Sequence, residues 1–152
     1  MSRSNWIVSK ILAFLVLVSC EHSGTRDHQV AYSLAAPTPA GVALVIKSDS
    51  DGQNVTAKTG TTIAVELIGV PTAGYMWTPT ETPAFLEAAG EYGGPTSSAQ
   101  LEPGFAGGNH WEAFLFKVTA KGEGVLRFEQ RRAWESDEPP ADEFSVYLFA
   151  EE

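Results

Sequence analysis

The sequence predicts an all-β sandwich formed by a single domain. Short runs rich in β-forming residues recur along the chain, and clusters of Gly, Pro, Asn, Asp and Ser separate them. Helical periodicity is scarce. A chain of 152 residues with 43% hydrophobic residues is long and apolar enough to form one core. Together, these observations favour two packed antiparallel sheets.

The first nineteen residues have the pattern of an export signal. Arg3 and Lys10 precede an apolar run that ends at Cys20. The run is shorter than the roughly 20 residues of a transmembrane helix, and its ending, LVSC, resembles the bacterial lipobox. We therefore expect residues 1–19 to be a lipoprotein signal peptide and Cys20 to carry a lipid anchor, which predicts an exported bacterial lipoprotein on a membrane of the cell envelope. An incidental signal-peptide residue and a free thiol are the alternatives for Cys20.

The next segment, residues 20–40, is predicted to be a flexible spacer. It is polar, rich in small residues, and ends in the sequence PTP followed by Ala40. Strand patterns begin after it, so the globular domain is expected to cover residues 41–152.

The first strands are expected at 42–47 and 61–68. In the second of these, Ile63, Val65 and Leu67 alternate with other residues and so share one buried face. The stretch GVPTAGYMW follows directly and combines turn-forming residues with two large aromatic residues.

The middle of the chain combines strand-like, helix-like and loop-like stretches. Tyr75 and Trp77 share one face of the next strand, and we expect both in the core. Residues 84–92 fit either a helix or a strand, and residues 93–108 are expected to form a long loop, of the kind that is usually functional or disordered.

Three strands are expected in the last third of the domain. Residues 111–120 alternate and have one apolar face, so this strand is predicted to be central. A second strand is expected at 125–134. The last strand, at 144–150, directs one set of apolar residues to one side, namely Phe144, Val146 and Leu148.

The sequence contains no catalytic or metal-binding pattern. It lacks the motifs of zinc proteases, serine hydrolases and phosphate-binding loops, and its three histidines lack metal-ligand spacing. His110 is interpreted as a solvated residue at a strand edge. The net charge of −9 argues against nucleic acid as a partner. We therefore expect a protein that is not an enzyme and needs no cofactor.

Three loops combine turn formers with a bulky side chain. They contain the sequences VPTAGYMW, EPGFAGGN and RRAWESDEPP. Each loop taken alone also fits a simpler explanation, in which Gly and Pro shape turns and Trp belongs to the core. In a sandwich, however, loops at the same end converge into one surface, as antibody loops do.

Together, the three loops resemble those of chagasin-type inhibitors of papain-like cysteine proteases. That family shows N-P-T-T-G-Y/F, then G-x-G-G, then R-P-W on an immunoglobulin-like sandwich. The counterparts here are Val70–Tyr75, Gly104–Gly108 and Arg132–Trp134, and the similarity covers about residues 53–150. The resemblance therefore implies an immunoglobulin-like antiparallel β-sandwich.

Four positions depart from the family motifs. Val70 replaces Asn, Ala73 replaces Thr, Phe105 replaces the first Gly of the second motif, and Ala133 replaces Pro. These departures bear on potency and target preference more than on the fold. The resemblance implies protease-binding roles for the retained residues, namely Pro71, Thr72, Gly74, Gly107, Gly108, Arg132 and Trp134. We also expect Ala73 and Phe105, in the same loops, among the protease-binding residues.

The resemblance also implies a mechanism. The loops 69–75, 101–109 and 131–138, hereafter the first, second and third loops, would fill the active-site cleft of a papain-like protease without covalent chemistry. Thr72 would approach the catalytic Cys–His pair, and a monomer would suffice.

Two roles stay open at this point, and so does one alternative function. Arg132 either pairs with a protease carboxylate or supports its own loop. Phe105 either fills an apolar pocket of the protease or packs onto its own loop. The alternative function is a non-inhibitory immunoglobulin-like envelope lipoprotein that binds another protein.

Overall fold

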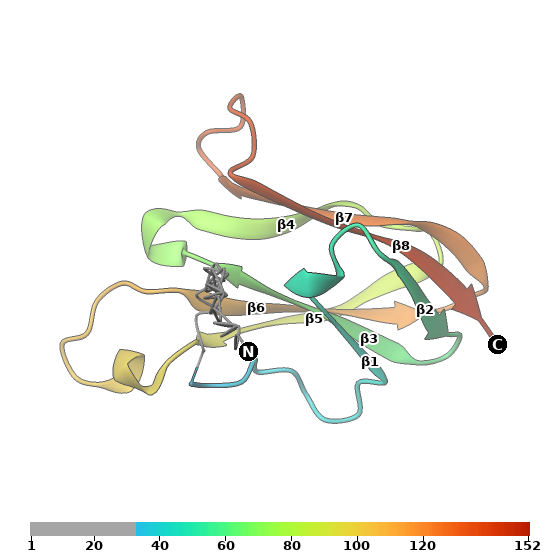
Figure 1. Ribbon diagram of the computed structural model, residues 1–152, viewed down its shortest axis with the longest axis horizontal. Coiled ribbons are helices and arrows are strands. Elements are labelled where there is room, and N and C mark those ends of the chain that lie inside the picture. The colour runs from blue at the N-terminus through green and yellow to red at the C-terminus, as the bar shows by residue number, and fades with distance from the viewer. Residues whose placement is uncertain (1–32) are drawn as a thin grey trace, which may run out of the picture. The chain divides into compact units, whose positions relative to one another are not determined.

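The computed structural model describes residues 33–152 and shows an all-β sandwich (Figure 1). The predicted fold class is therefore confirmed. Two four-stranded sheets form the sandwich, and three short 3-10 helices lie in the connections. The strands are β1 (Leu44–Lys47), β2 (Asn54–Lys58), β3 (Thr62–Gly69), β4 (Tyr75–Glu81), β5 (Leu86–Pro95), β6 (His110–Val118), β7 (Gly122–Arg132) and β8 (Asp142–Glu151).

The strand order in the first sheet is β1-β3-β6-β5, and in the second sheet it is β2-β8-β7-β4. Most neighbours are antiparallel, but β1 pairs with β3 and β2 pairs with β8 in parallel. The sequence did not predict these two parallel pairs. They arise because the chain crosses between the sheets after β1, so β1 and β2 add to different sheets instead of forming a hairpin. The predicted central position of β6 is confirmed, since β3 and β5 flank it.

Alternating apolar residues of both sheets form the core between them. The predicted inward faces are confirmed: Ile63, Val65 and Leu67 are at most 1% exposed. Phe128 lies at the centre, with its ring 4.9 Å from that of Phe114. Burial of each such side chain contributes about 1.5–3 kcal/mol to folding. The same alternation buries Phe144, Val146 and Leu148 of β8.

Most of the ambiguous segment at 84–92, from Leu86 onward, belongs to strand β5. The strand pairs with β6 from Leu86 to Pro95, across a bulge between Ala88 and Gly90. Pairing along this length overrides the helical preference of Ala, Leu and Glu, because it satisfies the backbone hydrogen bonds of an edge strand. It also corrects the expected loop at 93–108: its first residues, up to Pro95, belong to the strand.

Residues 33–40 differ from the spacer that the sequence predicts. They pack against the first sheet, where the Thr38 hydroxyl donates a hydrogen bond to Glu66 and the Trp111 indole donates one to the Leu34 carbonyl. The ordered domain therefore extends at least to residue 33, eight residues before the expected boundary. Glu66 and Trp111, which hold this segment, are distant in the sequence, and no local sequence pattern predicts these contacts.

The expected signal peptide and the lipid anchor on Cys20 lie outside the described residues. Within residues 33–152, no helix has the length and hydropathy needed to cross a membrane.

Candidate functional site

The three predicted loops lie at one end of the sandwich, on the side away from the C-terminus (Figure 1). Strand register places the first loop between the other two. Its beginning, Gly69, pairs with His110, which directly follows the second loop. Its end, Tyr75, pairs with Arg132 at the start of the third loop. Residues distant in the sequence thus form one continuous surface.

The first loop is a closed turn. Val70 and Tyr75 exchange two backbone hydrogen bonds, of 2.9 and 3.2 Å, and a 3-10 helix spans Pro71–Ala73 between them. Gly74 ends the helix with φ 83°, a left-handed conformation that favours glycine. The turn presents the side chain of Thr72 to solvent.

Arg132 connects the third loop to the first. Its Nε donates a hydrogen bond of 2.9 Å to the Ala73 carbonyl, and its NH1 group donates one of 2.9 Å to Glu135. The guanidinium also lies 4.5 Å from the centroid of the Tyr75 ring, within the range of a cation–π contact. Of the two roles left open for Arg132, its geometry in the free protein fits support of the loops.

Trp134 completes the contact between these two loops. Its ring lies so close to Gly74 that a Cβ at that position would collide with it. The side chain is nevertheless 69% exposed. Trp134 is therefore a surface residue, packed on the first loop along one side and open to solvent on the other.

Tyr75 and Trp77 were both expected in the core, and this expectation is correct for one of them. Trp77 is buried, with its indole nitrogen 2.8 Å from the Ile68 carbonyl. Tyr75 is only half-buried because it lies next to the loop, where the Arg132 guanidinium covers its ring instead of the opposite sheet.

The second loop is held by Gln100, which the sequence analysis missed. Its side-chain oxygen accepts hydrogen bonds from the backbone nitrogens of Thr96 and Ser97, and its Nε2 donates one of 2.7 Å to the Asn109 carbonyl. Gln100 thus joins the two ends of the loop. Ser97 and Gln100 form a capping box on the 3-10 helix Ser98–Leu101. The S-x-x-Q spacing is a readable signal that could have identified it.

The tip of the second loop exposes apolar side chains. Phe105 is 47% exposed, although one edge of its ring lies near Gly108, and Leu101 is 65% exposed. Both roles considered for Phe105 are therefore compatible with its position. Gly107 and Gly108 have φ values of 90° and 94°, a conformation that residues other than glycine rarely adopt.

A buried carboxylate lies beneath the first loop. Glu112 is 6% exposed, and its Oε2 accepts a hydrogen bond of 3.0 Å from the Trp77 backbone nitrogen. Its Oε1 occupies the space beside Gly69 where a Cβ would otherwise lie, and it has no hydrogen-bond partner among the described residues. Desolvation by burial is the main cause that raises the pKa of Glu112, and the nearby charge of Glu91 adds to the shift.

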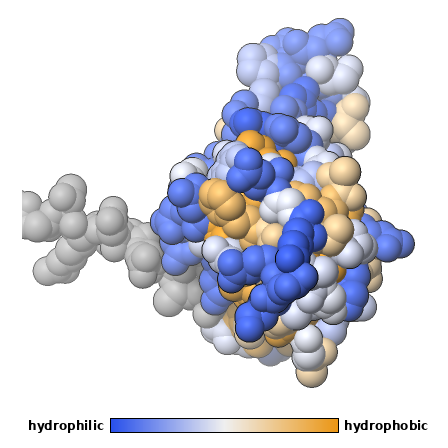
Figure 2. Space-filling model, turned by 90° about the vertical axis from the view of Figure 1, so that its right-hand side faces the viewer, coloured by the Kyte–Doolittle hydropathy of each residue, from blue (hydrophilic) through white to orange (hydrophobic). Residues whose placement is uncertain are grey.

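The two ends of the domain differ in their exposed apolar side chains. Leu101, Phe105 and Trp134 are strongly exposed in the loops. Figure 2 looks onto the opposite end, where hydrophobic residues appear in separate patches among hydrophilic ones. The turns there, at 59–61 and 119–121, contain no large exposed hydrophobic residue. Apolar side chains that remain in water at one end are typical of a protein-binding surface.

Comparison with known proteins agrees with this arrangement. Residues 56–148, more than half of the chain, match the chagasin family of peptidase inhibitors, I42. No match is found among curated proteins. The alternative of a non-inhibitory envelope lipoprotein receives no support from these comparisons.

Solved structures of low sequence identity share the fold. The cysteine protease inhibitor EhICP2 from Entamoeba histolytica superposes with a TM-score of 0.61 at 15% identity, over 73% of this chain and 100% of that one. Amebosin gives 0.55 at 23% identity, over 71% and 97%. The Leishmania mexicana protein ICP gives 0.50 at 24% identity, over 68% and 93%.

Proposed function

Because the chain belongs to the chagasin family of peptidase inhibitors, we propose that it inhibits papain-like cysteine proteases by filling their active-site cleft with its three loops. Inhibition would be non-covalent. The family is one of inhibitors and not of enzymes, and the proposal requires the chain to perform no reaction.

The observation that carries the proposal is the bracing of the first loop by the third. The Ala73 carbonyl is held by Arg132, and Gly74 is covered by Trp134. A loop already fixed in the free protein loses little conformational entropy when it binds, and that entropy is a major cost of association. Such bracing is expected of a loop that must enter a narrow cleft unchanged.

The exposed aromatic residues would supply much of the affinity. Trp134 and Phe105 are rigid and apolar, and they flank the first loop on its two sides. Truncation of an aromatic residue at the centre of an interface typically costs about 2 kcal/mol or more. Thr72, at the exposed tip, would approach the catalytic pair of the protease.

The experiment is a titration of the mature protein into papain and a small panel of related proteases. We expect reversible inhibition that competes with substrate, and weaker inhibition by Trp134→Ala. The departures at the tip make a second test: Val70→Asn with Ala73→Thr should tighten binding. Absence of inhibition by the wild type at micromolar concentration across the panel would contradict the proposal.

The predicted anchor is part of the same proposal. Cleavage before Cys20 and lipidation of its thiol would hold the inhibitor on a membrane of the cell envelope, since multiple acyl chains bind membranes firmly. The test is fractionation of cells that express the full chain or its Cys20→Ala variant. The wild type should be found with membranes, and an equal distribution of the two proteins would contradict anchoring.

A further inference from the structure

Residues 33–38 cross the outer face of the first sheet, and we refer to this segment as the strap. Near its end, Thr38 donates a hydrogen bond to Glu66 of β3, and Pro37 lies against Gly94 of β5. Near its beginning, Leu34 contacts β6 through the indole of Trp111. The strap lies outside residues 56–148, the part of the chain that matches the family.

The strap is bonded to the base of the second loop. The Leu34 nitrogen donates a hydrogen bond of 3.1 Å to the Thr96 carbonyl, and the Ser98 nitrogen donates one of 3.1 Å to the Ser33 hydroxyl. The Trp111 indole holds the Leu34 carbonyl at 2.9 Å. Thr96 and Ser98 flank the capping residue of the 3-10 helix that leads into the second loop.

The same helix carries the residue that closes the second loop. Gln100 accepts hydrogen bonds from the backbone of Thr96 and donates to the carbonyl of Asn109. The Thr96 hydroxyl also donates to the Asn109 carbonyl, at 3.2 Å. A continuous series of hydrogen bonds therefore runs from Leu34 through Thr96 and Gln100 to the far end of the loop.

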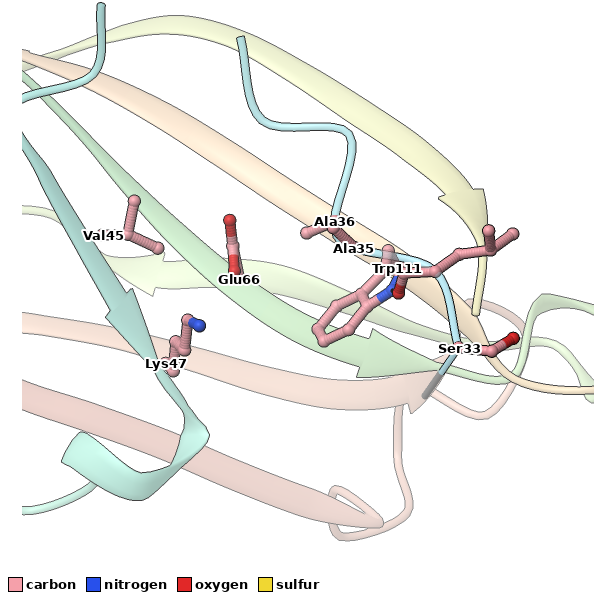
Figure 3. A pocket seen from close by; sticks show the side chains of 8 residues that line it. Ser33, Ala35, Ala36, Val45, Lys47, Glu66 and Trp111 are labelled. Atoms are coloured by element: carbon pink, nitrogen blue, oxygen red, sulfur yellow. The ribbon is translucent and has the colours of Figure 1, made fainter. Parts of the chain in front are cut away.

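Hydrogen bonds join the strap to β3, to β6 and to the base of the second loop. A pocket of about 470 Å³ lies beside it, lined by residues of the strap and by β-strand residues such as Val45, Lys47, Glu66 and Trp111 (Figure 3). In Figure 3 the indole of Trp111 lies alongside Ala35 and Ala36, and Glu66 lies farther along the sheet. Loss of a hydrogen bond at Leu34 should therefore release this end of the strap without opening the core.

We propose that the strap is a positioning element for the second loop, which it holds in the conformation that binds the protease. The inference rests on the proposed function and extends it to a segment outside the family match. Without the strap, Ser98 at the start of the 3-10 helix and Thr96 just before the helix each lose a hydrogen bond, and the loop of Phe105 must be ordered on binding. That ordering lowers affinity.

The first test compares Leu34→Pro with Leu34→Ala in the mature protein. Proline removes the N–H that bonds to Thr96, whereas alanine keeps it and removes the side chain. Amide hydrogen exchange at Ser97–Leu101 should become faster in Leu34→Pro alone. Inhibition of papain should weaken about tenfold, the size expected for one or two neutral hydrogen bonds.

A second variant tests the same hydrogen-bonded end of the strap without introducing a proline, so the test remains valid if Leu34→Pro fails to fold. Trp111→Phe keeps an aromatic ring but removes the indole N–H that bonds to Leu34, and it should produce the same two effects. The double variant Leu34→Pro with Phe105→Ala adds a specific readout. The loss of papain inhibition caused by the proline should be smaller in the Phe105→Ala background, because the second loop has then lost its exposed ring.

The outcomes separate this inference from the proposed function. Unchanged exchange at Ser97–Leu101 in both strap variants would overturn it. Faster exchange with unchanged inhibition would also overturn the positioning role. If the wild type inhibits no protease, the proposed function fails, and the exchange measurement alone then decides whether the strap orders the second loop.

Discussion

The first and second loops lie next to each other but are held in different ways. The first loop is braced from outside by Arg132 and Trp134 of the third loop. The second loop is closed by its own Gln100 and is tied to residues upstream of the family match. The braces of the first loop belong to the family motifs. In the second loop, the capping-box spacing marks Gln100, but no local pattern marks the upstream residues that bond to Thr96 and Ser98. Binding residues can thus be recognised from a motif even where some of the residues that position them cannot.

The largest effect on protease inhibition is expected from a substitution that breaks the bracing of the first loop. Gly74→Ala places a Cβ against the Trp134 ring at a φ of 83°. Backbone strain of this kind costs about 1–3 kcal/mol, and displacement of Trp134 adds to it. We expect papain inhibition to weaken about a hundredfold, which corresponds to roughly 2.7 kcal/mol, measured as the change in the inhibition constant.

Gly104→Ala is the matched control for this change. Gly104 has nearly the same φ, 84°, but a Cβ there meets no atom within 4 Å. Both variants therefore introduce the same backbone strain, but only Gly74→Ala places a Cβ against the Trp134 ring. Similar losses of inhibition in both would show that the contact between Gly74 and Trp134 is unimportant.

Removal of the Arg132 guanidinium should have the next largest effect. Arg132→Met keeps much of the aliphatic side chain but loses the hydrogen bonds to Ala73 and Glu135 and the contact with Tyr75. A hydrogen bond to a charged group contributes about 1.5–3 kcal/mol, so inhibition should weaken about thirtyfold. Arg127→Met, on the same strand but away from the loops, is the control and should inhibit like the wild type.

A smaller effect is expected when the closure of the second loop is removed. Gln100→Ala eliminates the hydrogen bonds that join Thr96 and Ser97 to Asn109. Several neutral hydrogen bonds are lost, but the exposed loop regains contacts with water, so we expect about tenfold weaker inhibition.

The double variant Arg132→Met with Gln100→Ala sharpens the comparison. If the two loops are held independently, the losses in binding free energy should add, as they do for sites without shared partners. Strong non-additivity in the inhibition constants would contradict separate bracing.

The sequence predicted the sandwich well because alternation is a local property. The inward faces of β3 and β8 follow directly from the spacing of Ile63, Val65 and Leu67 and of Phe144, Val146 and Leu148. The sequence alone could not identify β5 as a strand, because its pairing with β6, and not its composition, determines its conformation.

The candidate site could be predicted only in part. Its exposed residues, such as Thr72 and Trp134, follow from motif order. The contacts that hold them were not predictable, because Arg132 and Ala73 lie 59 residues apart and Trp111 and Leu34 lie 77 apart. Such pairs depend on strand register, which is a property of the whole fold.

The smallest expected effect on inhibition concerns Glu112, beneath the first loop. Because its folded pKa is raised above the ordinary value of 4.5, its ionisation is disfavoured in the folded state. Its contribution to stability is complete below about pH 4.5 and decreases as the pH rises through the folded pKa. Glu112→Gln keeps an oxygen that can accept the Trp77 N–H but removes this ionisation.

The melting temperature of Glu112→Gln should therefore increase relative to the wild type as the pH rises, by up to a few degrees. Thermal unfolding of both proteins from about pH 4 to pH 8 measures it. Glu91 and His110 line the same pocket in both proteins, so the difference between the two curves isolates Glu112. Inhibition should change little, because the hydrogen bond to Trp77 persists. A constant difference across the pH range would show that folding does not raise the pKa of Glu112, and would leave this residue as a support of the first loop through its hydrogen bond to Trp77 and its packing beside Gly69.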